Sequence, residues 1–196
     1  LPDARSDVYA LAATLHTLIR WGAYRWVAPY EIDASALAEL AAGLPSCLDT
    51  EVLVLGAVPL AYSPRCFTAA RRNLDRRACA RACREFPGGE SVRTLEGEDL
   101  FVQDGKQTLS MRPVSLLAEL DAVLAAGAGV LRVQPVLHGT GTALRALRDA
   151  LDGRLDGGEA HRIAEGVLGH GSSNGFWHGG AGMERVVTPL WPPRRS

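Results

Sequence analysis

Residues 52–83, VLVLGAVPLAYSPRCFTAARRNLDRRACARAC, organise the chain. The stretch opens on the apolar run Val52–Leu60, which is typical of a buried strand. Cys66 follows shortly after this run. In parallel α/β folds, functional side chains collect where strands end and helices begin. We therefore expect Cys66 to lie at the functional end of its strand.

Two further cysteines, Cys79 and Cys83, follow at helical spacing. No Pro or Gly interrupts residues 74–85, so we predict a helix there with Asn73 as its N-cap. Residues four apart share one face of a helix, so both thiols can converge with that of Cys66. Three convergent thiolates are typical ligands of zinc or of an iron–sulfur cluster. Because the spacing matches no common zinc signature, buried structural thiols are the alternative.

The fourth cysteine, Cys47, lies in the loop that enters the strand, at the opposite end from Cys66. A strand of about seven residues spans roughly 23 Å. We therefore interpret Cys47 as a structural or incidental thiol that does not share the site. Free cysteines without an extracellular context favour a reducing compartment and metal ligation over disulfides, so we expect a cytoplasmic protein.

The rest of the chain alternates between helical and strand patterns, which is the rhythm of parallel α/β units. With 196 residues and enough apolar content for a core, it is expected to form a single domain, 1–196. Parallel strands are predicted near 24–28, 51–58, 107–111 and 130–134. Helices are predicted over 6–21, 35–42, 116–126, 142–151 and 159–168.

Two regions depart from this rhythm. Residues 84–104 are predicted to form an inserted turn and short hairpin, and residues 169–196 a glycine-rich tail without regular structure. The net charge of −1 gives no global attraction to nucleic acid or to a membrane surface. No apolar run approaches the length of a membrane-spanning helix, and no signal-peptide pattern opens the chain.

Arginines surround the cysteines. On a helical projection Arg76 lies near the thiols and can offset their charge, whereas Arg77, Arg81 and Arg84 fall on the opposite, solvated face. RNA binding is the alternative explanation of this charge, but no aromatic side chains are interleaved for stacking on bases. We therefore do not expect nucleic acid as the partner.

Two glycine-bearing segments are further candidates. Residues 133–142 join a strand to a helix, and backbone N–H groups there suit an anion, with His138 nearby. The alternative is an ordinary helix capped by Thr140 or Thr142. The motif NGFWH at 174–178 either lines a ligand or plugs the end of the fold. No Ser–His–Asp or H-E-x-x-H pattern is present, so the sequence shows no proteolytic apparatus.

Several of these motifs resemble the collagenase-like peptidase family, and in particular its members in ubiquinone biosynthesis. The matching residues are Arg25–Val27 with Pro29 and Glu31, PLAYSPRCFTA at 59–69 apart from Pro64, Asn73 and Leu74, the cysteines Cys79 and Cys83, Pro87 and Gly89, and NGFWHG at 174–179. Many members of this family are not proteolytic. The chain begins at Leu1, and the resemblance implies that an N-terminal part of the family fold is absent from it.

The resemblance implies a (β/α) TIM-like barrel, of which this chain is the C-terminal half. It implies a [4Fe–4S] cluster bound by Cys66, Cys79 and Cys83, with a fourth cysteine in the absent N-terminal part. It further implies a heterodimer with a UbiU-like partner, which acts in the oxygen-independent hydroxylation of a quinone precursor. An RNA-hydroxylating relative and a zinc-stabilised scaffold without catalysis are the alternative functions.

Overall fold

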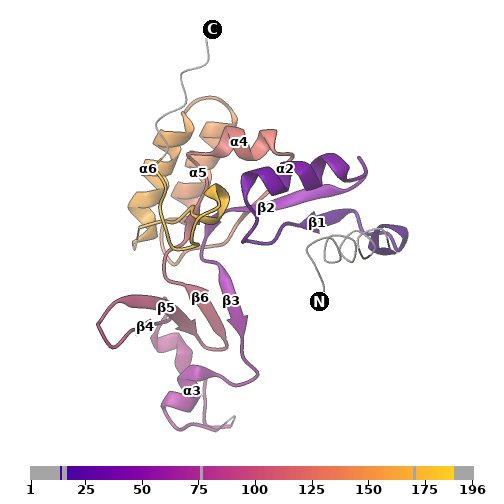
Figure 1. Ribbon diagram of the computed structural model, residues 1–196. Helices are drawn as coiled ribbons and strands as arrows, with labels where there is room; N and C mark the ends of the chain where they lie inside the picture. Colours follow the sequence, from indigo (N-terminus) through magenta and orange to yellow (C-terminus); the bar gives the residue numbers. More distant parts are fainter. Residues whose placement is uncertain (1–13, 15–16, 76, 170, 188–196) are drawn as a thin grey trace.

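The computed structural model describes residues 14, 17–75, 77–169 and 171–187. Its strands form two sheets that meet where the chain passes from β2 into β3 (Figure 1). The first sheet is mainly parallel and lies among the helices, whereas the second is antiparallel and projects away from them (Figure 1). The helix predicted over 6–21 lies mostly outside the described residues, and its described end is helical.

The first sheet is built around β2, its longest and most buried strand. Its members are β1 (Arg25–Val27), β2 (Asp49–Gly56), β7 (Val114–Ser115) and β8 (Val130–Val133). Both β1 and β8 run parallel to β2, as predicted, and Glu51 pairs with residues of both. Leu55 pairs with β8 and with the antiparallel β7. Since a strand has only two edges, β1 and β7 share the edge of β2 that β8 does not occupy.

Four helices pack with this sheet and supply most of the hydrophobic core. They are α2 (Ala34–Gly43), α4 (Leu120–Ala125), α5 (Thr140–Leu151) and α6 (Gly157–Leu168). Leu37 of α2, Val54 of β2 and Val123 of α4 are completely shielded from solvent. The faces that α5 and α6 bury are made largely of alanines, which lets the two helices approach closely.

The second sheet spans residues 59–110, and we call this part of the chain the cysteine lobe. Its antiparallel strands, in spatial order, are β3 (Pro59–Tyr62), β6 (Gln107–Ser110), β5 (Asp99–Asp104) and β4 (Glu90–Arg93). The short helix α3 (Phe67–Arg71) and the 3-10 turn η1 (Ala82–Glu85) complete it. Among the described residues of the lobe, the buried ones are Thr68, Ala69, Ala82 and Gly105. The lobe therefore has no hydrophobic core of ordinary size.

The strand predicted over 107–111 does not belong to the parallel sheet. Residues 107–110 form β6, which pairs antiparallel with both β5 and β3. The cause is the two-residue turn Gly105–Lys106, because so short a connection can join only antiparallel strands. The hairpin predicted within 84–104 corresponds to β4 and β5, which pair antiparallel in the same sheet. The described strands form two open sheets and no closed barrel.

The prediction of a single helix over 74–85 is wrong as well. α3 ends at Arg71, and the described residues between it and η1 form turns and irregular chain. Asn73 has a φ of 52°, the left-handed conformation that commonly ends a helix. The Asp75 carboxylate then accepts the backbone N–H groups two and three residues ahead, both at 2.7 Å. Such local bonds compete with the hydrogen bonds of a helix.

The two sheets are joined at Gly56, where the chain leaves β2. Gly56 has a φ of 120°, a conformation that glycine adopts far more readily than other residues. A Cβ at this position would lie 2.5 Å from the Cβ and from the carbonyl oxygen of Gln134, which follows β8. The junction between the sheets therefore depends on the absence of a side chain at residue 56.

We expect Gly56→Ala to lower the free energy of unfolding by about 2 kcal/mol or more, because it adds both backbone strain and a steric clash. Urea-induced unfolding of the purified protein measures this loss. The control is Gly43→Ala at the end of α2, where the φ is not positive and the surrounding space is open. That variant should be neutral or slightly stabilised. An equal loss in both variants would contradict the role given to Gly56.

Candidate functional site: the cysteine lobe and the C-terminal pocket

Three cysteines lie in the cysteine lobe, and two of them, Cys66 and Cys83, lie near the turn between β5 and β6. Cys66 precedes α3, and the next backbone N–H donates to the carbonyl oxygen of Gly105 at 2.8 Å. A Cβ built on Gly105 would lie 3.9 Å from the Cβ and 4.0 Å from the Sγ of Cys83. The carbonyl of Cys79 accepts the N–H of Ala82, the first residue of η1, at 2.8 Å. All three thiols are half-buried and free.

Cys79 and Cys83 do not share a helix as predicted. Cys66 is the residue before α3, Cys79 lies in a turn and Cys83 lies in η1. Cys47 is exposed and precedes β2, at the end of that strand remote from the lobe. Within the described part of the chain, no three His, Cys, Asp or Glu side chains are arranged to hold a metal ion. The donor set itself, three free thiols on one small lobe, fits a soft metal or an iron–sulfur cluster in its chemistry.

Ion pairs fix the chain on both sides of Cys79. Arg72 donates to the two carboxylate oxygens of Glu85 at 2.8 and 2.7 Å, and its guanidinium lies 5.1 Å from the centre of the Phe86 ring. These hydrogen bonds raise the pKa of Arg72 and lower the pKa of Glu85. Arg71 pairs with Glu90 at the start of β4. The turn after α3 is thus tied to η1 and to the sheet.

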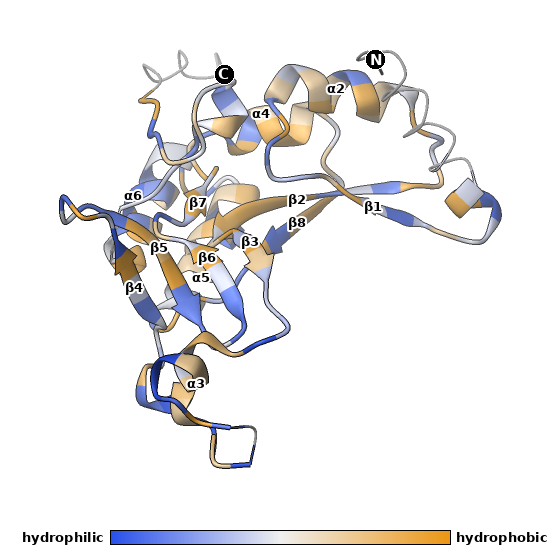
Figure 2. Cartoon of the chain, turned by 60° about the horizontal axis from the view of Figure 1, so that its bottom comes forward, coloured by the Kyte–Doolittle hydropathy of each residue, from blue (hydrophilic) through white to orange (hydrophobic). Residues whose placement is uncertain are grey.

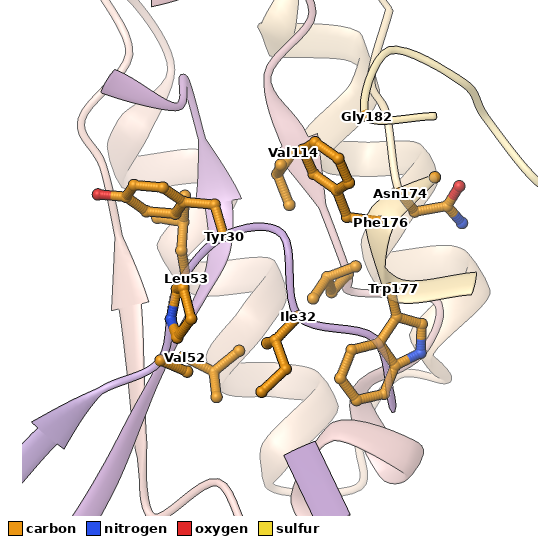
Figure 3. A pocket seen from close by; sticks show the side chains of 13 residues that line it. Tyr30, Ile32, Val52, Leu53, Val114, Asn174, Phe176, Trp177 and Gly182 are labelled. Atoms are coloured by element: carbon orange, nitrogen blue, oxygen red, sulfur yellow. The ribbon is translucent and has the colours of Figure 1, made fainter. Parts of the chain in front are cut away.

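An apolar pocket lies between the first sheet and the C-terminal segment (Figure 3). Tyr30 and Leu53 stand on one side of it, and Val114 and Phe176 on the other (Figure 3). Its cavity measures about 30 Å³, which is room for about two water molecules. The walls are apolar and partly aromatic, but the cavity is far smaller than the roughly 300–1,000 Å³ of typical small-molecule sites, so it has room for no more than the edge of a small apolar group.

The NGFW motif folds the C-terminal segment that closes this pocket. The side-chain amide of Asn174 accepts the N–H of Val186 at 2.7 Å and donates to its carbonyl at 2.9 Å, as a neighbouring strand would. A Cβ on Gly175 would lie 1.8 Å from the carbonyl oxygen of Ala181, so only glycine fits there. Trp177 is 6% exposed and belongs to the core. The motif therefore acts both as a plug and as the wall of the pocket.

A buried carboxylate, Glu119, stands behind Asn174. Its Oε1 accepts a hydrogen bond from Asn174 Nδ2 at 2.7 Å and lies 3.4 Å from Nε2 of His178. Its Oε2 is buried without a hydrogen-bond partner among the described residues. Burial of an incompletely paired carboxylate is costly, so the surrounding fold must hold it in place. Sequence analysis missed Glu119, because within a predicted helix it looks like any polar residue.

A second chain of hydrogen bonds joins β7 to α6 and to the C-terminal segment. Ser115 Oγ lies 2.9 Å from His161 Nδ1, and His161 Nε2 lies 3.0 Å from Glu165 Oε2. Ser172 Oγ donates to the same carboxylate oxygen at 2.6 Å. The spacing of four between His161 and Glu165 is the one sign of this chain in the sequence. Ser115 is 0% exposed, so its hydroxyl cannot reach a substrate and the chain is structural.

The model of peptidase family U32 matches residues 9–186, which is most of the chain. The chain is a member of peptidase family U32. This match confirms the resemblance to the collagenase-like peptidases at the level of the family. No solved structure matches the U32 chain. In the part of the chain that the structure describes, no helix is both long and apolar enough to cross a membrane.

The start of α5 in this U32 protein differs from the predicted cap. The residue before the helix is Gly139, with a φ of 82°, and no side chain caps the first turn. Thr140 Oγ1 instead accepts the N–H of Val136 at 3.0 Å and donates to the carbonyl of the same residue at 2.9 Å. Thr142 Oγ1 accepts a hydrogen bond from a guanidinium within the helix. The hydroxyls therefore serve the loop and the helix surface, and His138 beside them is exposed.

We expect the U32 protein to lose stability as the pH falls below about 6.5, through His161. Burial, and then the charge of Arg185, lower the pKa of His161, while Glu165 and Glu119 act in the opposite direction. The unfolded chain therefore binds this proton more readily than the fold. The stabilisation is complete above the unfolded pKa and is lost as the pH falls toward the folded one.

Urea unfolding at about pH 7.5 and about pH 5.5 measures this dependence. His161→Gln should reduce the difference between the two conditions. His138→Gln, at an exposed position, should leave the difference unchanged. The same pH dependence in both variants would show that another group is responsible.

Proposed function

We propose that this U32 protein is an iron–sulfur protein of oxygen-independent ubiquinone biosynthesis, similar to UbiV. It acts in the cytoplasm as a heterodimer with a UbiU-like partner, in the hydroxylation of the quinone precursor ring. The observation that carries the proposal is the cysteine lobe, in which three free thiols lie on a fold without a hydrophobic core.

The lobe needs a source of stability other than burial. Among its described residues only four small ones are buried, which removes far less apolar area from water than a self-supporting domain does. Natural folds of this size without a core are usually stabilised by disulfides or by a bound metal. The cysteines of the lobe are free, and they are three of the four in the chain. A bound metal group accounts for both features at once.

In this proposal Cys66, Cys79 and Cys83 bind a [4Fe–4S] cluster, and the fourth ligand comes from elsewhere in the full-length protein. A bound cluster of this type supplies one-electron chemistry. Cys79 and Cys83 stand on turns rather than on a long helix, so the backbone that carries them can rearrange without breaking a helix. Metal binding would then be coupled to the folding of the lobe.

The pocket at the NGFW motif is the proposed place for the precursor ring. Its support is the character of the walls, which are apolar and include Tyr30, Phe176 and Trp177 (Figure 3). Aromatic side chains pack well against another ring and exclude water from it. Because the cavity is small, only the ring edge enters, and the rest of the precursor stays outside.

The same proposal places the first sheet in a larger (β/α)-barrel, of which this chain contributes the C-terminal half. Three parallel strands, with helices in the connections between them, support this arrangement. The outer edges of β1 and β8 have no partner strand among the described residues. Tyr24, just before β1, exposes 69% of its surface, and Val27, in β1, exposes 44%. Additional parallel strands would cover both the edges and these side chains.

We expect Cys79→Ser to leave the full-length protein with less than about half of its iron and acid-labile sulfide after anaerobic reconstitution, because a cluster ligand is lost. Cys47→Ser is the matched control and should keep its iron, since Cys47 lies at the far end of β2. Iron and sulfide analysis of both variants gives the result. Equal iron content in the two variants would show that these thiols do not bind the cluster.

Spectroscopy and quinone analysis distinguish the alternatives. Visible and electron paramagnetic resonance spectra of the reconstituted protein should show a [4Fe–4S] cluster, whereas stoichiometric zinc without iron would support a scaffold. An anaerobically grown deletion strain should lack ubiquinone. Normal ubiquinone together with unmodified RNA in that strain would favour the RNA-hydroxylating function instead.

A further inference from the structure

The end of the cysteine lobe concentrates positive charge. Residues 65–85 contain seven arginines against one aspartate and one glutamate, a net charge of +5. The whole chain has a net charge of −1, so the remaining residues carry −6. α3 and the turns beyond it lie at the end of the lobe farthest from the first sheet, and Figure 2 shows hydrophilic stretches along them. Charge is therefore segregated between this protrusion and the rest of the molecule.

Most of this positive charge is not neutralised within the fold. Two of the arginines form the ion pairs with Glu85 and Glu90 described above. Four others are exposed and make no ion pair with any residue that the structure describes, namely Arg65, Arg77, Arg81 and Arg84. Like charges within a Debye length of about 8–10 Å repel one another. The charge thus opposes the folding of a lobe with little core, which points to a partner that compensates it.

We propose that these four residues, the arginine tip, dock a small acidic electron-carrier protein. That the partner is an electron carrier rests on the proposed function, because the tip adjoins the cysteines assigned to the cluster. Opposite charge would steer an acidic partner to the tip and hold it in the small, short-lived kind of interface that redox partners form. Tyr62 and Phe67, which expose 69% and 40% of their surface at the base of the tip, supply aromatic contact.

Nucleic acid fits this surface less well than a protein does. No aromatic side chain is interleaved among the arginines from residue 71 to residue 84, and the exposed aromatics of this surface, Tyr62 and Phe67, precede that run. The rest of the chain, with its charge of −6, repels a polyanion that extends past the tip. A compact acidic protein can meet the tip alone. Charge and composition together therefore favour the protein partner.

The test is a calorimetric titration of the full-length, reconstituted protein with an acidic [2Fe–2S] ferredoxin as the probe. Binding should weaken at least about tenfold between about 50 mM and about 300 mM salt, because screening shortens the reach of the charges. The double variant Arg77→Glu/Arg84→Glu should weaken binding at least about tenfold at the lower salt concentration. Arg81 is left intact because its φ of 62° makes a substitution there a backbone change as well.

The matched control is Arg145→Glu/Arg162→Glu, which makes the same charge change at exposed arginines of α5 and α6. It should bind the ferredoxin as the unaltered protein does. The neutralising pair Arg77→Gln/Arg84→Gln should show a smaller loss than charge reversal, which separates charge from misfolding. Gel filtration and iron analysis of every variant show whether fold and cluster are retained.

Equal binding by the tip variant and the control would overturn the proposal. So would tighter binding of single-stranded oligouridylate than of ferredoxin at the same salt, or self-association that the tip variant abolishes. The two proposals fail in different ways. A protein that holds iron but does not bind ferredoxin contradicts the docking site alone. A protein that binds ferredoxin through the tip but holds no iron supports the docking site and contradicts the cluster.

Discussion

The cysteine lobe must hold four strands and two short helical segments together while burying little more than Thr68, Ala69, Ala82 and Gly105. Backbone hydrogen bonds pair its strands, but each contributes only about 1 kcal/mol net. Ordering the backbone costs roughly 1–2 kcal/mol for every residue. An antiparallel sheet normally offsets this cost by packing one face on a core. Since that core is missing, the lobe depends on an additional constraint, and its three free thiols are the groups best suited to supply one.

The first sheet is supported differently, and the chain passes from β2 into the lobe and returns from β6 into β7. β2 is buried along most of its length, and its continuation beyond Gly56 becomes β3 of the lobe. Cys66 follows β3 by only four residues, and the lobe returns to the first sheet from β6 into β7, so two chain segments set its position. The C-terminal segment is held on the same sheet by Asn174 and Glu119 and by the hydrogen bonds of His161. β2 therefore connects the core to the lobe, and β7 connects the core to the C-terminal segment that forms a wall of the pocket.

The parallel strands and α2 could be predicted, because continuous apolar runs and a good cap are local signals. Asp33 accepts the N–H of Ala36 at 2.9 Å and so caps the first turn of α2. The helix over 74–85 could not, because the absence of Pro and Gly does not make a helix when Asn73 turns left-handed. The series of hydrogen bonds from Ser115 through His161 to Ser172 could not be predicted either, because it joins residues of β7, α6 and the C-terminal segment. The charge of the arginine tip was visible, but its segregation from an acidic body required the fold.

Hydrogen–deuterium exchange of the protein, with and without anaerobic iron–sulfur reconstitution, tests most directly whether a cluster takes the place of the missing core. Peptides from residues 59–110 should lose protection when iron is removed, while peptides from β2 and α5 in the first part keep theirs. Exchange in the lobe should then approach that of an unfolded chain. If the lobe stays equally protected without iron, its stability has another source and the cluster does not hold it together.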